Sequence, residues 1–203
     1  MKIKLKISKA VFNKAYLPFL YAATRTQIFF GGSSSGKSVF LAQRAVLDVA
    51  QGRRNYLITR KVARTIRASV FNEINKTIRR FKLTEYFNVN KSDMVITCVN
   101  GYQILFAGLD DVEKVKSITP QKGVITDVWV EEATETERND IKQLQKRLRG
   151  LSKTGKRLTL SFNPIIQTHW IYTEYFGGWD DSKNLYQDED LLILRTTYRD
   201  NKF

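Results

Sequence analysis

The sequence is poor in cysteine, histidine and proline, with one, one and three residues of these types among 203. The single thiol, Cys98, leaves no partner for an internal disulfide or a thiolate metal cluster, which fits a reducing cytoplasm. We interpret Cys98 as a small buried residue of a strand. The single imidazole, His169, is interpreted as a packing or hydrogen-bonding group, because a histidine metal site needs further ligands. The few prolines mark no interior linker.

Long apolar runs are missing as well. No stretch approaches the roughly 18 apolar residues of a membrane span, and the basic N-terminus, MKIKLKISKA, lacks the apolar segment of a secretory signal. We find neither an internal repeat nor a low-complexity segment. The sequence therefore predicts a soluble, unprocessed protein with one domain over residues 1–203.

Acidic residues are few relative to basic ones. Twenty Asp and Glu stand against 34 Lys and Arg, which gives a net charge of +14. Such an excess attracts polyanions, and nucleic acid is the leading candidate. The alternative is that the basic surface serves solubility or meets an acidic part of a larger assembly.

Short apolar strands alternate with longer helical patterns along the chain, which predicts an α/β fold with a central, mostly parallel sheet flanked by helices. Asn100-Gly101 lies between two apolar runs and predicts a tight antiparallel hairpin. The predicted strands span residues 26–30, 55–59, 93–99, 102–108, 123–130, 157–162 and 191–196. The predicted helical segments span residues 37–51, 60–82 and 136–149.

A phosphate-binding loop is the most specific local pattern. The run GGSSSGKS at residues 31–38 fits G-x4-GKS and lies between a predicted strand and a predicted helix. Its glycines allow backbone N–H groups to surround phosphate oxygens at a helix N-terminus. In such a loop Lys37 bridges the β- and γ-phosphates of ATP, and the Ser38 hydroxyl binds Mg²⁺. The predicted ATP-binding residues of the loop are Gly31, Gly32, Ser33, Ser34, Ser35, Gly36, Lys37 and Ser38.

Two carboxylates end the predicted strand 123–130. ATP hydrolysis requires a second Mg²⁺ contact and a group that orients the attacking water, and both are expected at the carboxyl end of a neighbouring parallel strand. We predict that Glu131 holds the metal through water and that Glu132, on the other side of the strand end, is the general base. The alternative is a solvated acidic pair.

Several runs in a fixed order resemble one family. They are GGSSSGKS, GLDDVEKVKS, GVITDVWVEEATE, LSFNP, HW and TTYRDN, and the resemblance spans roughly residues 20–203. The chain resembles the N-terminal ATPase region of the large terminase subunit of tailed bacteriophages, the motor that packages DNA into proheads. The resemblance implies a P-loop NTPase fold of the RecA-like (ASCE) type, with a Walker B region at 124–132 and a coupling motif at 161–164.

The same resemblance implies further site residues. It makes Glu131 the Walker B metal residue and Glu132 the catalytic carboxylate. It implies that Asn163 senses the γ-phosphate and relays hydrolysis to a movement, with simple turn chemistry before proline as the alternative. It also implies that Gln27 reads adenine, with a strand-surface glutamine as the alternative.

Many relatives use an arginine finger, in the P-loop or shortly before the Walker B strand. Here the loop carries serines, and the cation before the strand is Lys122, a point charge without the planar fork of arginine. We expect Lys122 as the catalytic cation, with Lys116, Arg147 and Arg149 as rivals. For each of them a solvated surface cation is the alternative.

Basic residues at helical spacing follow the second predicted strand and are candidates for one wall of a DNA channel. They are Arg60, Lys61, Arg64 and Arg67. Contacts to phosphates are expected, without sequence readout and with steep salt dependence. A solvated basic helix face is the alternative.

The resemblance implies the partners and the setting of the chain. Double-stranded DNA, a homo-oligomeric ring on a portal, the small terminase subunit and the host cytoplasm are expected, with no membrane. A nuclease domain follows the ATPase region in this family; we recognise none in these 203 residues and expect no cleavage by them. The alternatives are another P-loop DNA motor such as a helicase, a nucleotide-gated DNA-binding module without turnover and, last, a small-molecule kinase.

Overall fold

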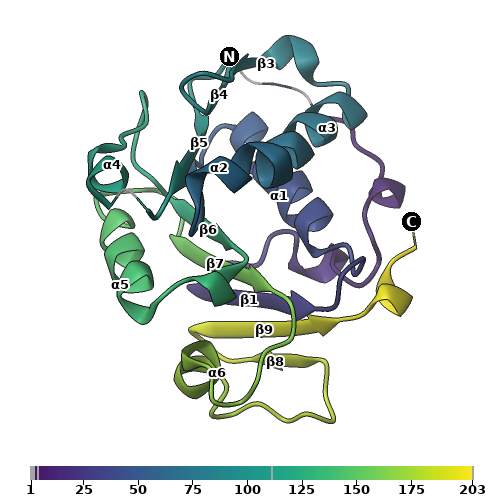
Figure 1. Cartoon of the computed structure of the whole chain (residues 1–203). Helices are drawn as coiled ribbons and strands as arrows, with labels where there is room; N and C mark the ends of the chain where they lie inside the picture. The colour runs from purple at the N-terminus through teal and green to yellow at the C-terminus, as the bar shows by residue number, and fades with distance from the viewer. Residues whose placement is uncertain (1–2, 4, 111, 203) are drawn as a thin grey trace.

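A nine-stranded β-sheet runs through the chain (Figure 1). The computed structural model describes residue 3 and residues 5–110 and 112–202. The strands are β1 (Thr26–Gly31), β2 (Tyr56–Arg60), β3 (Phe87–Asn90), β4 (Val95–Cys98), β5 (Gln103–Gly108), β6 (Asp127–Glu131), β7 (Arg157–Phe162), β8 (Leu185–Gln187) and β9 (Leu191–Thr196). Their order is β3-β4-β5-β2-β6-β7-β1-β9-β8. Neighbours from β5 to β9 in this order pair in parallel, whereas β3, β4 and β8 pair antiparallel. The predicted mostly parallel sheet is confirmed.

Helices cover both faces of the sheet (Figure 1). The helices are α1 (Lys37–Gln51), α2 (Ala63–Ile66), α3 (Asn72–Arg80), α4 (Val112–Ser117), α5 (Arg138–Arg147) and α6 (Trp170–Tyr175). α1, α2 and α3 contribute to one apolar core and α4, α5 and α6 to the other. Side chains of β1 alternate between these cores, because Phe29 faces the first, and Ile28 and Phe30 face the second. Burial on both faces explains the continuous apolar run of this strand.

The long helical pattern after β2 is interrupted. Its apolar residues at helical spacing, Val70, Phe71, Ile74 and Ile78, are buried as the pattern predicts. Between α2 and α3 the chain forms a π-helical turn (Arg67–Phe71), in which the backbone of Ser69 departs from helical values at φ −101° and ψ −105°. Such turns are often found at functional sites.

The other predicted elements are confirmed with small shifts of their ends. β1, α1, β7 and β9 lie where the sequence places them, and the hairpin around Asn100-Gly101 pairs β4 with β5. β6 begins only at Asp127, because the carbonyls of Lys122 and Val124 accept from the side chain of Asn55 instead of pairing with a strand. The sequence did not reveal β3, α4, α6 and β8. Asp111, in the run DDVEKVKS, lies outside the described residues.

Both minor interpretations of single residues are confirmed. Cys98 is buried in β4. His169 precedes α6, where its ring accepts a hydrogen bond from the Ile171 N–H at 3.2 Å and lies 3.2 Å from the carbonyl of Thr134. Within the described part of the chain, no helix combines the length and the apolar character needed to cross a membrane.

A buried ion cluster lies at the amino-terminal ends of the central strands. The guanidinium of Arg157, at the start of β7, bonds to Asp127 at the start of β6 and to Asp48 in α1. It also donates to the phenol of Tyr56 at 2.7 Å, and Tyr56 in turn donates to Asp48 at 2.5 Å. Arg54 pairs with Asp127 at 3.0 Å. Burial raises the pKa of Tyr56, so the phenol stays protonated as a donor.

We predict that Arg157→Met strongly destabilises the fold. Removing one partner of a buried ion pair leaves uncompensated charge and costs about 3–5 kcal/mol. Urea unfolding followed by tryptophan fluorescence measures the loss. The matched control is Arg138→Met, which breaks an exposed pair with Glu174 and should cost about 1 kcal/mol or less. Equal unfolding free energies for the two variants would contradict the structural role of the cluster.

Candidate functional site

Three parallel strands place their carboxyl ends around one open pocket of about 270 Å³. β7 lies between β1 and β6, so the loops after these strands are neighbours. The pocket is lined by Ser33, Ser34, Ser35, Gly36, Lys37, Ser38, Val39, Glu131, Glu132, Ser161, Phe162, Asn163 and Asn201. The predicted loop, both carboxylates and Asn163 are therefore brought together.

The loop between β1 and α1 has a backbone that requires glycine. Gly36 precedes α1 at φ 86°, in the left-handed region that glycine adopts freely. Gly31 lies so close to β9 that a Cβ atom would stand 1.8 Å from the carbonyl oxygen of Thr196. Gly31 and Gly32 do not line the pocket. Their carbonyls accept hydrogen bonds from Lys37, which does line it.

The ammonium of Lys37 lies among neutral oxygens. It donates to the carbonyls of Gly31 and Gly32 at 2.7 and 3.2 Å, to the Ser35 hydroxyl at 3.3 Å and to Asn163 Oδ1 at 3.4 Å. Burial lowers the pKa of Lys37, and the charge of Glu132 opposes this shift. An anion in the pocket would stabilise this buried positive charge, because none of its present hydrogen-bond acceptors is charged.

Two side chains hold Glu131 at the end of β6. They are Arg60, the last residue of β2, and Ser69 of the π-helical turn. The hydroxyl of Ser69 donates to Glu131 Oε2 at 2.8 Å, and Arg60 lies 4.0 Å from the same oxygen. Burial raises the pKa of the Glu131 carboxyl, whereas the bond from Ser69 and the charge of Arg60 lower it. The π-helical turn thus aims Ser69 at this carboxylate.

Glu132 leaves the strand in an unusual conformation. Its φ of 50° and ψ of 51° lie in the left-handed region, which residues other than glycine rarely adopt. Glu131 and Glu132 line the same pocket, which their predicted roles at one nucleotide require. Backbone strain of this kind is concentrated at functional sites.

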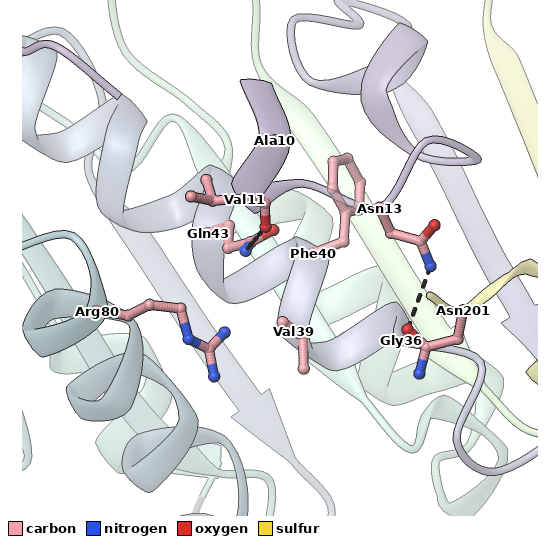
Figure 2. Close-up of a pocket in the computed structure, with 9 residues that line it drawn as sticks. All are labelled: Ala10, Val11, Asn13, Gly36, Val39, Phe40, Gln43, Arg80 and Asn201. Carbon is pink, nitrogen blue, oxygen red and sulfur yellow. Dashed lines mark hydrogen bonds between the residues drawn. The ribbon is translucent and has the colours of Figure 1, made fainter. Parts of the chain in front are cut away.

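A second, more apolar pocket of about 360 Å³ adjoins the first (Figure 2). The two share Gly36, Val39 and Asn201. The other lining residues are Ala10, Val11, Asn13, Phe40, Gln43 and Arg80. Figure 2 shows Asn13 and Asn201 joined across its edge and Arg80 extending toward it from α3.

The structure does not support the predicted contact of Gln27 with adenine. Gln27 is fully buried, and its amide donates to the carbonyls of Ala22 and Thr24 at 3.0 and 2.9 Å. Its oxygen accepts from Arg44 at 2.5 Å. Because these bonds engage both ends of the amide inside the core, the side chain has no polar group to offer a base edge.

The predicted finger cations lie away from the site within this chain. Lys122 donates to the carbonyl of Asn100 at 2.9 Å and stands over the ring of Tyr102. It precedes β6, at the opposite edge of the sheet from Glu131. Lys116, Arg147 and Arg149 line another pocket together. Among the described residues, Lys37 is the only cation that lines the phosphate-loop pocket.

The basic residues at the end of β2 and beyond it divide into two groups. Arg60 bonds to Glu135 at 3.1 Å, and Lys61 bonds to Asp140 at 2.8 Å. These two are therefore paired with carboxylates. Arg64 and Arg67 are exposed, and Arg67 donates to the Lys91 carbonyl at 2.8 Å.

The donors for a metal ion fit Mg²⁺. The Ser38 hydroxyl and the Glu131 carboxylate line the same pocket, and Mg²⁺ prefers such oxygen ligands in small number, with phosphates and water completing its shell. Groups of three or more His, Cys, Asp or Glu side chains that could hold a metal are absent from the described residues. The two protein donors therefore fit a metal ion that binds together with a phosphate ligand.

Several residues of the site carry no sequence signal of their own. Ser69, Asn13 and Asn201 lie in separate segments and reach the site only through the fold. Asn201 belongs to the run TTYRDN, whose recurrence in the family was the one available indication.

The loop lies between a buried strand and a helix, and its lysine lines one pocket with two carboxylates from the end of a nearby parallel strand. These features define a P-loop α/β fold of the nucleotide-binding class. Residues 23–203 match the family described as phage terminase large subunit. The chain therefore belongs to the phage terminase large subunit family, as the sequence motifs predict.

Individual relatives agree with this assignment. The PBSX phage terminase large subunit of Bacillus subtilis (strain 168) is 28% identical over 177 residues, which cover 87% of this chain and 40% of that protein. The large terminase from a thermophilic bacteriophage has the same fold, with a TM-score of 0.72 at 19% identity over 94% of this chain and 47% of that one. The same terminase in complex with ATP-gamma-S gives a TM-score of 0.70 at 18% identity, over 94% of this chain and 46% of that chain.

A shorter structure matches over almost its full length. The N-terminal domain of the DNA packaging ATPase from bacteriophage phi29 has a TM-score of 0.63 at 12% identity, and the match covers 93% of this chain and 97% of that domain. By contrast, the chain spans less than half of the PBSX protein and less than half of the thermophilic phage terminase.

We predict that Gln27→Ala lowers stability without changing base preference. It removes the acceptor of a buried arginine, which costs about 1–3 kcal/mol. Chemical unfolding measures the loss, and competition between ATP and GTP for the protein measures the preference. A variant of unchanged stability that no longer distinguishes ATP from GTP would restore the adenine role.

Proposed function

We propose that this chain is the ATP-hydrolysing motor domain of a viral terminase large subunit and that it powers movement of double-stranded DNA into a prohead. The observation that carries the proposal is the pocket where Lys37 meets Glu131, Glu132 and Asn163. The family supports it, as does the fold shared with a terminase in complex with ATP-gamma-S and with a DNA packaging ATPase.

Phosphate binding follows from the state of the loop. The N–H groups at the start of α1 and the positive end of its dipole favour an anion in the pocket. Lys37, now bonded to loop carbonyls, is the group that would turn to the β- and γ-phosphates of ATP. Asn163 accepts from Lys37 at 3.4 Å, so a movement of the lysine changes the contacts of the loop after β7. This supports Asn163 as the sensor.

Mg²⁺ would be held by Ser38 and, through water, by Glu131. When bound it neutralises charge that develops on the phosphates. Ser69 and Arg60 fix the orientation of Glu131 for that role. Glu132, which its left-handed backbone turns into the pocket, would take a proton from the attacking water as general base.

The adjoining pocket suits the nucleoside of ATP. It shares Gly36, Val39 and Asn201 with the phosphate-loop pocket, so one ligand can extend from one to the other. Its walls offer apolar side chains such as Phe40, together with the amide of Gln43, which donates to the Val11 carbonyl at 2.9 Å. We therefore assign nucleoside binding to this pocket rather than to Gln27.

A second cation for the γ-phosphate would come from a neighbouring subunit. Lys37 is the one described cation lining the pocket, and a cation supplied in trans is worth about 10³ to 10⁵ in rate in other P-loop enzymes. Lys122, Lys116, Arg147 and Arg149 remain candidates to act across such an interface. A cation supplied in this way supports a homo-oligomeric assembly, and membership of the phage terminase family supports a ring on a portal in the host cytoplasm.

DNA would contact the exposed arginines between β2 and α3. Arg64 and Arg67 are exposed on that segment, while Arg60 and Lys61 are paired with carboxylates. The small terminase subunit and a nuclease domain elsewhere in the protein complete the proposed machine. The chain covers 40% of its PBSX relative, and the nuclease step is not assigned to these residues.

We predict that Glu132→Gln abolishes ATP turnover and retains ATP binding. Loss of a general base costs about 10² to 10⁴ in rate, while the amide keeps the shape of the side chain. Phosphate release is measured over a range of protein concentrations, with and without double-stranded DNA, beside equilibrium ATP binding. The control, Glu189→Gln, removes an exposed carboxylate outside the pocket.

The outcome also separates the two candidate functions. Turnover that depends on Glu132 and rises with protein concentration or DNA is the result expected of a motor completed in trans. Equal ATP binding by wild type and Glu132→Gln, with hydrolysis by neither under any condition, would instead favour a nucleotide-gated DNA-binding module.

We predict that Arg64→Ala combined with Arg67→Ala weakens DNA binding equally for all sequences. Each lost phosphate contact should reduce the slope of log K against log salt by about 0.9. Fluorescence anisotropy at several salt concentrations measures the slope. The matched double control is Lys142→Ala with Lys146→Ala on exposed positions of α5, on the other face of the sheet. Equal slopes for both double variants would refute this DNA surface.

A further inference from the structure

The run TTYRDN begins at the last residue of β9, and its Asn201 lies at the wall that the two pockets share. Hydrogen bonds within the run stabilise its turn. The Asp200 carboxylate accepts from the N–H and the hydroxyl of Thr197 at 2.7 and 3.1 Å. The Thr197 hydroxyl accepts from the N–H of Arg199 at 3.3 Å. These bonds close the short turn Tyr198–Asp200 and bring Asn201 back toward the loop after β1.

The first threonine of the run is anchored to the P-loop. Tyr16 is fully buried, and its ring stacks on that of Phe40 with the ring centroids 4.8 Å apart. Its phenol donates to the Ser35 carbonyl at 3.0 Å. A phenol has one hydrogen to donate, so the bond of 2.7 Å between Tyr16 and Thr196 has Thr196 as donor. Burial raises the pKa of Tyr16, which keeps that hydrogen in place.

Asn201 joins three separate segments of the chain. Its Nδ2 donates to the Ser34 carbonyl at 2.8 Å, and its Oδ1 accepts from Asn13 at 3.3 Å (Figure 2). It also packs against the turn into α1, since a Cβ atom on Gly36 would lie 3.3 Å from Asn201 Oδ1. The N-terminal segment, the P-loop and the segment after β9 therefore meet at one side chain.

The bond to Ser34 acts at a point where the loop needs support. Ser34 has a φ of 64°, in the left-handed region that is unfavourable for a serine. Asn201 fixes the carbonyl of this residue, and through it the direction of the N–H groups that follow. Asn201 also lines both pockets, at their shared wall.

We infer that Asn201 is a nucleotide-positioning residue, which holds the P-loop in its binding conformation at the boundary between the phosphate and nucleoside pockets. The inference rests on the proposed function, because it assumes that a nucleotide extends through both pockets. A loop held in its bound shape before the ligand arrives loses less conformational entropy on binding. Asn201 thus acts on affinity, whereas Glu132 acts on the chemical step.

Equilibrium binding of fluorescent ATP and ADP analogues tests the inference. Asn201→Ala and Asn201→Asp, the second of similar shape but without the donor to Ser34, should each weaken binding about tenfold or more. Asn13→Ala, which keeps the bond to Ser34, should give a smaller loss in the same direction. Tyr198→Ala is the control, since Tyr198 is 65% exposed in the same turn and lines neither pocket.

The kinetic readout separates positioning from a general structural effect. The KM for ATP should rise in the Asn201 variants while kcat stays within about threefold and the thermal midpoint of the nucleotide-free protein stays at that of Tyr198→Ala. Affinities within about twofold of wild type, or losses that follow the fraction of unfolded protein, would overturn the inference. Failure of the wild type itself to bind ATP would instead refute the proposed function.

Discussion

The buried ion cluster around Arg157 is the constraint on which the geometry of the site depends. Its members come from the start of β7, the start of β6, the start of β2 and the body of α1. The same strands and helix carry the site residues at their other ends: Asn163 follows β7, Glu131 ends β6 and Lys37 begins α1. Because strands and helices are stiff, fixing one end of these elements fixes the relative positions of the other ends. A charged cluster in an apolar core is costly unless all its partners are present, so it also penalises any other register.

The site built on this framework holds its charged groups apart until a ligand arrives. Lys37 is bonded to neutral oxygens, and Glu131 is bonded to Ser69, so the opposite charges of the pocket have separate partners. A nucleotide triphosphate with Mg²⁺ would supply an anion to Lys37 and a second positive charge to Glu131, which already has Arg60 at 4.0 Å. Glu132, held with a left-handed backbone, and Asn163, in contact with Lys37, are positioned to respond to that change. The arrangement supports the proposed hydrolysis of ATP in one pocket and the proposed mechanical response through the loop after β7.

The sequence predicts the parts of the site that depend on local pattern and fails where a contact comes from a distant segment. The P-loop, the strand that ends in Glu131 and the order of the central elements follow from glycine spacing and apolar periodicity. The sequence does not separate an adenine contact from a core role for Gln27, because the partner that holds it in the core, Arg44, comes from α1. Lys122 precedes β6 and Glu131 ends it, so the length of one strand separates the two side chains within this chain. Short marginal strands such as β8 have too few residues to show a period, and Asn201 and Ser69 reach the site through tertiary packing alone.

The most direct measurement is a crystal structure of this chain with Mg²⁺ and ATP-gamma-S. We expect the Lys37 ammonium to leave the carbonyls of Gly31 and Gly32 for the β- and γ-phosphates. Ser38 and Glu131 should face the metal, and the nucleoside should lie in the pocket beside Phe40. A nucleotide bound elsewhere, or a triphosphate in the pocket with Lys37 still on the loop carbonyls, would contradict this expectation.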